Sequence, residues 1–125
     1  MTKKRILIVD DSMFMRNNIK RIIEQGGHIV CGEAANGHEA ILQYEILNPD
    51  IVTLDVTMPV MDGLEATKCI RTLGKADSRT VPIIAMTANA FDEDMKKSID
   101  SGMNGHLSKP IDINKLYKVL QEILC

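Results

Sequence analysis

The chain has 125 residues, of which 45% are hydrophobic and 26% are charged, and its formal net charge at pH 7 is −2. This length suits one domain with a buried core, and the small net charge gives no general attraction to nucleic acids or anionic membranes. The three cysteines lie far apart without CxxC spacing, which argues against a disulfide framework or a zinc site. We therefore expect one domain over residues 1–125, in the reducing cytoplasm.

In the first half of the chain, short apolar runs predict three buried strands, and the stretches between them predict two helices. The first run is too short for a secretion signal or a membrane span. A glycine pair ends the first helix and an Asn-Pro pair ends the second. The predicted elements are a strand at residues 6–9, a helix at 15–23, a strand at 28–34, a helix at 41–47 and a strand at 51–54.

The second half continues the same alternation. Acids at residues 92–94 fall in the first turn of the fourth expected helix, where the helix dipole favours negative charge. Asp112 is a predicted N-cap of the last helix. The predicted elements are a helix at residues 66–73, a strand at 81–86, a helix at 91–99, a strand at 104–108 and a helix at 113–124.

Five strands alternating with five helices predict an α/β fold with a parallel sheet and helices on both faces. Right-handed crossovers leave few possible topologies for such a sheet. The best match is a flavodoxin-like (βα)5 fold with strand order 2-1-3-4-5.

Polar residues follow the predicted strands at the points where they end. Asp10 and Asp11 follow the first strand, Asp55 the third, Thr87 the fourth and Lys109 the fifth. Because parallel strands all end at the same edge of the sheet, we expect these five residues to gather there. In the expected order, strands one and three are neighbours at the switch point, where open α/β sheets bind ligands.

Three carboxylates crowded together repel one another unless a cation lies between them. A small set of hard oxygen ligands suits Mg²⁺, or Mn²⁺, rather than zinc. A lysine on the same edge is able to hold a phosphoryl oxygen, and a threonine supplies a hydroxyl donor. Together these groups predict in-line phosphoryl transfer to an aspartate.

Each of these residues also has an ordinary structural explanation. Asp10 or Asp11 could cap the first helix, and Asp55 could be a turn residue. Lys109 could simply be solvated and Thr87 could begin a helix. The joint placement of all five at one edge favours the functional interpretation.

Four segments are characteristic of a known family. They are residues 7–12 (Leu-Ile-Val-Asp-Asp-Ser), 55–63 (Asp-Val-Thr-Met-Pro-Val-Met-Asp-Gly), 86–90 (Met-Thr-Ala-Asn-Ala) and 105–110 (Gly-His-Leu-Ser-Lys-Pro). Over essentially its whole length the chain resembles the receiver domain of bacterial two-component response regulators, which has the chemotaxis-Y-like fold. The family is regulatory, so the resemblance implies self-phosphorylation and self-dephosphorylation but no other enzymatic activity.

The resemblance implies a role for each matched site residue. Asp55 would be the phosphoacceptor. Asp11 would bind Mg²⁺ directly, Asp10 would act mainly through water, and the backbone carbonyl of Thr57 would supply a further metal ligand. Lys109 would pair with Asp55 and then with the phosphoryl group.

The resemblance also implies a switch. Thr87 would move toward the phosphoryl group, and the residue at position 106 would turn inward. That residue is His106, where most relatives carry Tyr or Phe. Thr57 and Asn89 would modulate the lifetime of the phosphoryl group, and Pro110 would follow a cis peptide bond.

The implied partners are proteins. A histidine kinase or a histidine phosphotransfer protein would supply the phosphoryl group, and Met13 and Phe14 are candidates for contact with it. The surface formed by the fourth helix, fifth strand and fifth helix would control a downstream protein. We expect no nucleic acid or membrane binding, and either a monomer or a phosphorylation-dependent dimer.

Two other functions are compatible with parts of the pattern. An aspartyl-nucleophile phosphatase of the haloacid dehalogenase type would need a second Asp two residues after Asp55, where the chain has Thr57. A flavin-binding electron carrier would need a phosphate loop in place of the acidic pair, which would repel a phosphate without a metal.

Overall fold

The predicted elements are all present, in the predicted order. The computed structural model describes residues 3–56, 58, 60–75, 77–87, 92–109 and 111–124, apart from the side chains of 92–95 and 124. The elements are β1 (Arg5–Val9), α1 (Met13–Gln25), β2 (Ile29–Ala34), α2 (Gly37–Leu47), β3 (Ile51–Asp55), α3 (Gly63–Arg71), β4 (Ile83–Thr87), α4 (Asp92–Ser101), β5 (Gly105–Ser108) and α5 (Ile113–Leu124).

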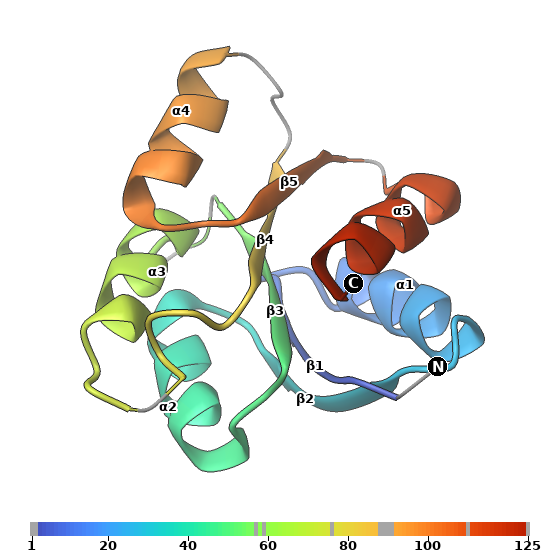
Figure 1. Ribbon diagram of the computed structural model, residues 1–125, viewed down its shortest axis with the longest axis horizontal. Coiled ribbons are helices and arrows are strands. Elements are labelled where there is room, and N and C mark those ends of the chain that lie inside the picture. Colours follow the sequence, from blue (N-terminus) through green and yellow to red (C-terminus); the bar gives the residue numbers. More distant parts are fainter. Residues whose placement is uncertain are drawn as a thin grey trace.

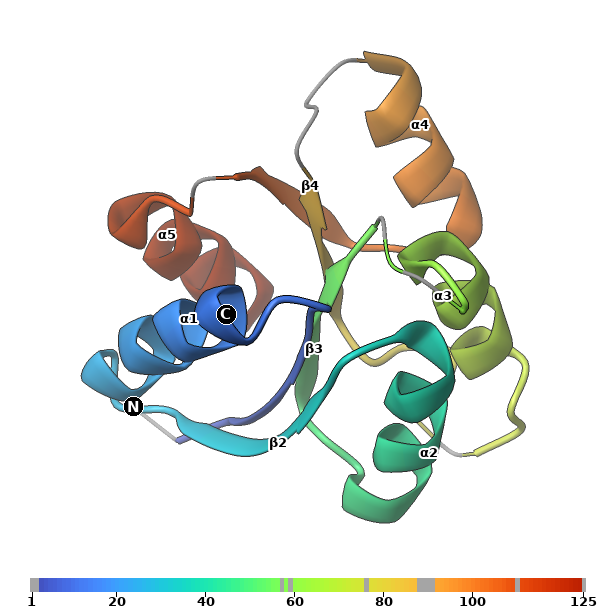
Figure 2. The same cartoon turned by 180° about the vertical axis from the view of Figure 1, so that it is seen from behind.

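The strands form one parallel sheet in the order β2-β1-β3-β4-β5, which confirms the flavodoxin-like topology. Helices α1 and α5 cover one face, and α2, α3 and α4 lie on the other side (Figures 1 and 2). Strands β1 and β3 are hydrogen-bonded neighbours, so the order reverses beside β1. The carboxyl ends of these two strands therefore border the crevice at the switch point.

Both faces of the sheet are buried, which explains why the strands are continuous apolar runs instead of alternating ones. Alternate residues of each central strand enter two separate cores. The core under α2 and α3 contains, from the sheet, Leu7, Val9, Val52, Leu54, Ile83 and Ala85. The core under α1 and α5 contains Ile6, Ile8, Ile51, Ile84, Met86 and Leu107.

The start of the fourth strand was predicted too early. It begins at Ile83, whereas Val81 closes a turn by donating its N–H to the carbonyl of Asp77 at 2.8 Å. Pro82 has no N–H to add to the ladder, so the sheet pairing starts after it. The predicted cap of the last helix is confirmed, because Oδ1 of Asp112 accepts from the N–H groups of residues 114 and 115 at 2.8 and 3.1 Å.

Cys31 and Cys69 are free and half-buried, as expected of a chain without a disulfide framework. Cys31 packs against the core under α2, and burial raises the pKa of its thiol. Within the described ranges, no helix combines the length and the apolar character that crossing a bilayer requires.

Candidate active site at the carboxyl edge of the sheet

The five polar residues predicted to meet at one edge each sit at a strand end. Asp55 is the last residue of β3 and Thr87 the last of β4, while Asp10 and Lys109 directly follow β1 and β5. Asp11 comes next in the loop that leads to α1. The N–H of Lys109 donates to the carbonyl of Thr87 at 2.8 Å, which fixes the end of β5 beside the end of β4.

The three acids form a compact cluster. One carboxylate oxygen from each of Asp10, Asp11 and Asp55 lies within 4.8 Å of the others. Asp10 and Asp55 are only 0% and 4% exposed, so water screens their charges poorly, whereas Asp11 is open to solvent. An all-oxygen donor set with one side open to water fits a hard divalent cation that keeps part of its hydration shell.

Lys109 is the cation that the chain itself supplies to this cluster. Its Nζ lies 2.9 Å from Oδ2 of Asp10 and 3.2 Å from Oδ2 of Asp55. Burial alone would lower the pKa of Lys109, but the hydrogen bond that its amine donates to Asp10 and the negative charges of Asp55 and Asp10 outweigh the burial and raise the pKa. The ammonium group therefore stays protonated at neutral pH.

Neither member of the acidic pair is the N-cap of α1. That cap is Ser12, whose Oγ accepts from the N–H of Met15 at 3.3 Å. The N–H of Ser12 in turn donates to Oδ1 of Asp10 at 2.9 Å. The carboxylate of Asp11 has no hydrogen-bonding or ion-pairing side-chain partner in the part of the chain that the structure describes. The capping explanation for Asp11 is thus wrong, and its oxygens remain available to a ligand.

The loop after Asp55 depends on Gly63. A Cβ at this position would collide with the backbone carbonyl of Asp55, and the N–H of Gly63 donates to the carbonyl of Val56 at 2.9 Å. Asp62 caps α3 by accepting from the N–H of Glu65 at 2.9 Å. The Asp-Gly pair therefore brings the start of α3 directly against the strand end that carries Asp55.

The two expected switch residues lie on one face of the sheet. Thr87 is 8% exposed and His106 is half-buried. In the β4–β5 register, Ala85 pairs with His106 and Thr87 with Ser108. Because side chains alternate along a strand, Thr87 and His106 both point to the side of the sheet that Ala85 faces, under α3.

Three predicted site residues cannot be placed. Thr57, Asn89 and Pro110 lie outside the described residues, so the metal-binding carbonyl, the rate-modulating side chains and the cis peptide bond stay predictions.

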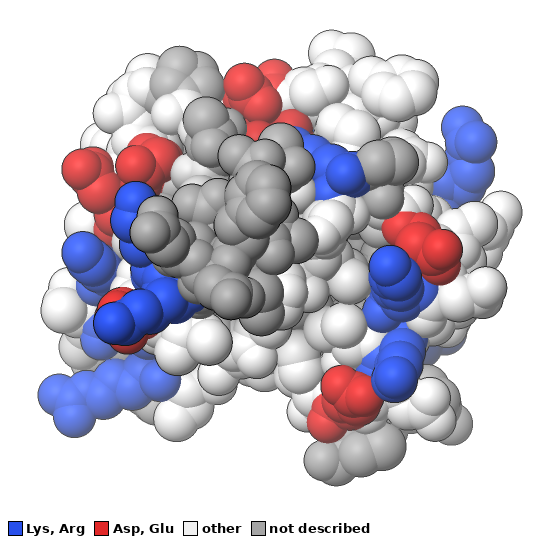
Figure 3. Space-filling view, turned by 90° about the horizontal axis from the view of Figure 1, so that it is seen from above, with Lys and Arg blue, Asp and Glu red and all other residues white. Residues whose placement is uncertain are grey.

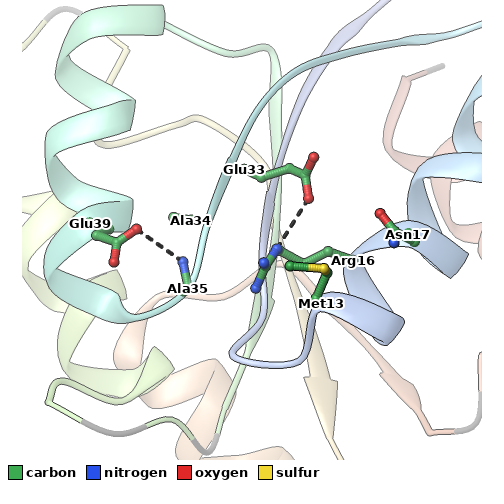
Figure 4. Close-up of a pocket in the computed structure, with 7 residues that line it drawn as sticks. All are labelled: Met13, Arg16, Asn17, Glu33, Ala34, Ala35 and Glu39. Carbon is green, nitrogen blue, oxygen red and sulfur yellow. Dashed lines mark hydrogen bonds and ion pairs between the residues drawn. The ribbon is translucent and has the colours of Figure 1, made fainter.

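One feature of the site was not predicted. Arg16, in the first turn of α1, donates from Nη1 to the backbone carbonyl of Asp10 at 2.7 Å and from Nε to Oε1 of Glu33 at 3.1 Å. The ion pair stands beside a hollow between α1 and the β2–α2 loop (Figure 4). The one sequence signal was a basic residue close to a helix N-terminus, where the dipole disfavours it.

The carboxyl edge does not present a single field of positive charge. Seen from above, both signs of charge lie around the grey atoms: basic side chains gather on the left, acidic ones lie at the upper centre and upper left, and the two are mixed on the right (Figure 3).

Comparison with known proteins identifies the sequence pattern. Residues 6–121 match the family model described as the response regulator receiver domain. The chain is 39% identical to the chemotaxis protein CheY of Thermotoga maritima, over 96% of this chain and 97% of that one.

Two solved structures share the fold over nearly the whole chain. The receiver domain of a sensor histidine kinase from Pseudomonas aeruginosa, solved with a magnesium ion coordinated in its active site cleft, has a TM-score of 0.87 and 34% identity, covering 99% of this chain and 100% of that one. CheY from a Borrelia burgdorferi complex with CheX, BeF3 and Mg²⁺ has a TM-score of 0.89 and 30% identity, covering 98% and 90%.

Proposed function

This chain belongs to the response regulator receiver domain family of two-component signalling, and from that premise we propose that it is a switch that accepts a phosphoryl group on Asp55. Receiver domains are regulatory proteins, not enzymes with an external substrate. The single observation that carries the proposal is the contact of one lysine amine with two buried carboxylates, Asp10 and Asp55.

In the proposed reaction, a carboxylate oxygen of Asp55 attacks the phosphorus of the donor. The new oxygen–phosphorus bond makes an acyl phosphate, and the bond from phosphorus to the donor nitrogen or oxygen breaks with its electron pair leaving on the donor. Lys109, held protonated beside Asp55, orients the nucleophile and neutralises charge that develops on the phosphoryl oxygens.

Asp10, Asp11 and Asp55 would hold a divalent cation, Mg²⁺ or Mn²⁺, with the carbonyl of Thr57 as a further predicted ligand. When bound, the cation supplies charge neutralisation that lets an anionic phosphoryl group approach the three acids. The close approach of their oxygens supports this assignment, and so does the solvent-exposed carboxylate of Asp11, which has no side-chain partner among the described residues.

The switch would use Thr87 and His106. Thr87 would donate its hydroxyl to a phosphoryl oxygen, and His106, on the same face of the neighbouring strand, would repack toward the vacated space. Asn89 and Thr57 would set the lifetime of the phosphoryl group. The mechanism would be a shift in population between two packings of the surface formed by α4, β5 and α5.

Protein partners would contact two regions. Near the acids, Met13 and Phe14 are 66% and 78% exposed, which supports contact with a histidine kinase or a histidine phosphotransfer protein. On the output surface, Ile99 of α4 and Ile113 of α5 are exposed apolar residues that a downstream protein could cover. A cytoplasmic location, a single domain over residues 1–125, and a monomer or phosphorylation-dependent dimer stay predictions.

The test is intact-mass spectrometry after incubation with acetyl phosphate, with and without Mg²⁺. We expect one phosphoryl adduct on the wild type, dependent on the metal and absent from Asp55→Asn. Asp100→Asn, which removes an exposed acid on α4, is the matched control and should be labelled like the wild type. Equal labelling of Asp55→Asn, or no metal-dependent adduct on the wild type, would overturn the proposal.

A further inference from the structure

Arg16 occupies a position at which a positive charge does not stabilise the helix. It lies in the first turn of α1, a helix described over its whole length and without an acid in that turn. The positive end of the helix dipole disfavours a cation there. A side chain that leans back toward the helix N-terminus, however, reaches the loop that precedes the helix. The contacts of Arg16 in that loop therefore have to explain its position.

With the contact from Arg16, the backbone N–H, the backbone carbonyl and Oδ1 of Asp10 are all held by hydrogen bonds. The N–H of Asp10 donates to the carbonyl of Ala34 at 3.0 Å, and its Oδ1 accepts from the N–H of Ser12. Its carbonyl oxygen accepts from Nη1 of Arg16 at 2.7 Å. Only Oδ2 of this residue is left to face Lys109. The same peptide unit carries the nitrogen of Asp11, and because the unit is planar, holding the Asp10 carbonyl also fixes where Asp11 begins.

Glu33 neutralises the positive charge of Arg16. A guanidinium close to a cation site would repel the cation, but Oε1 of Glu33 lies 3.1 Å from Nε of Arg16, and the two side chains are 33% and 14% exposed. Arg16 thus uses two different nitrogens for its two partners. A guanidinium can do this because its donors sit on separate nitrogens of a rigid plane, whereas the three donors of an ammonium group share one nitrogen, which would have to lie close to both acceptors at once.

We propose that Arg16 is a positioning residue for the metal-binding acids, and that Glu33 is its charge-balancing partner. Arg16 fixes the orientation of the peptide group between Asp10 and Asp11. The backbone of Asp11 is thereby placed so that its carboxylate lies close to those of Asp10 and Asp55. Glu33 orients the guanidinium and cancels its charge. This inference rests on the proposed function, because it assigns Arg16 to the same metal site.

The surroundings of the pair make it testable without disrupting the core. Arg16 and Glu33 line a hollow of about 350 Å³, together with residues such as Met13, Asn17 and Glu39 (Figure 4). A shorter side chain at position 16 therefore enlarges an open hollow and leaves no sealed cavity. Arg16→Gln removes the hydrogen bond to the Asp10 carbonyl and the ion pair with Glu33.

The experiment is calorimetric titration of the full chain with Mg²⁺, well below the unfolding temperature. Arg16→Gln is expected to weaken Mg²⁺ binding by about tenfold, the order typical of groups that orient metal ligands. Arg16→Lys should recover only part of that loss, because it keeps the charge and not the fork. Glu33→Gln keeps a hydrogen-bond acceptor for Arg16 but leaves the positive charge of the guanidinium uncompensated. The affinity for Mg²⁺ should therefore fall by about threefold, and this loss should become smaller at high salt, where charges are screened.

Two controls separate positioning from general stability. Arg21→Gln removes an exposed arginine from the same helix, and Arg71→Gln destabilises the opposite edge of the sheet; both should bind Mg²⁺ like the wild type. Wild-type affinity in Arg16→Gln, or an equal loss in Arg71→Gln, would overturn the inference alone. A wild-type protein that binds no Mg²⁺ would overturn the metal site and the inference with it.

Discussion

The two edges of the sheet each hold a half-buried cation, but their partners differ. At the amino edge an arginine donates to neutral oxygens, whereas at the carboxyl edge a lysine pairs with carboxylates that repel one another. The guanidinium of Arg71 donates at 2.7–3.2 Å to the carbonyls of Ser78, Val81 and Gly102 and to Oδ1 of Asn104. At the carboxyl edge, Lys109 pairs with Asp10 and Asp55, and Asp11 adds a third negative charge.

The difference separates a structural network from a functional one. Arg71 ties α3 to the loops before β4 and β5, and each of its donors is used within the fold. The acid cluster carries more negative charge than its lysine neutralises, so its electrostatic balance is incomplete without a ligand. Removing a member of the first network should change stability alone, while removing a member of the second should change how stability depends on Mg²⁺.

The largest effect is expected at the amino edge. Arg71→Gln leaves several backbone carbonyls without their donor and should lower the free energy of unfolding by about 3 kcal/mol. The loss should be the same with and without Mg²⁺, as measured by denaturant unfolding. Arg79→Gln, which removes an exposed arginine from the neighbouring loop, is the matched control and should have little effect. A loss that Mg²⁺ repairs would contradict the separation of the two edges.

Lys109→Met should behave in the opposite way. Without Mg²⁺, two buried carboxylates lose their ion-pair partner, and we expect a loss of about 2 kcal/mol. A saturating concentration of Mg²⁺ should close most of this gap, because the cation replaces the missing positive charge and binds only the folded state. The measurement is denaturant unfolding over a Mg²⁺ series, with Lys118→Met as the exposed control. A gap that stays constant over the series would show that Lys109 acts here through packing and not through charge.

The carboxyl edge was more predictable from sequence than the amino edge. Asp10, Asp55 and Lys109 follow apolar runs directly, and parallel strands bring their ends together whatever the side-chain details. The continuous apolar runs also predicted that both sheet faces are buried. A rule about strand ends was therefore enough to place the acids and the lysine, before any contact was known.

The networks around these residues could not be predicted in the same way. The contact of Arg71 with Gly102 joins residues 31 apart in sequence, and that of Arg16 with Glu33 joins residues 17 apart. Such contacts depend on how far a flexible side chain reaches once the helices have packed, which hydrophobic periodicity does not encode. The early prediction for the start of β4 failed for a related reason, because Val81 is apolar but its N–H is used in a turn.

A buried tyrosine at the amino edge gives the smallest and most specific test of the comparison. Tyr44 is 0% exposed, and its hydroxyl donates to Oδ1 of Asp77 at 2.7 Å. Burial raises the pKa of Tyr44 far above its ordinary value, and the hydrogen bond to Asp77 and the charge of Asp77 raise it further. The raised pKa means that the folded state keeps this proton at pH values where the unfolded state releases it.

Tyr44→Phe should therefore lower the free energy of unfolding by about 1 kcal/mol at neutral pH, through the lost hydrogen bond. The contribution of Tyr44 is fully present below the unfolded-state pKa of about 10 and is lost as the pH rises from there through the folded-state pKa. The gap between the wild type and Tyr44→Phe should thus narrow above about pH 10 and be indifferent to Mg²⁺. Tyr117→Phe, which removes a hydroxyl that donates to the carbonyl of Ile22 at 3.0 Å, controls for the loss of one phenol. If the gap instead stayed constant in alkali but varied with Mg²⁺, the two edges would be coupled, and the division between a structural and a ligand-dependent edge would fail.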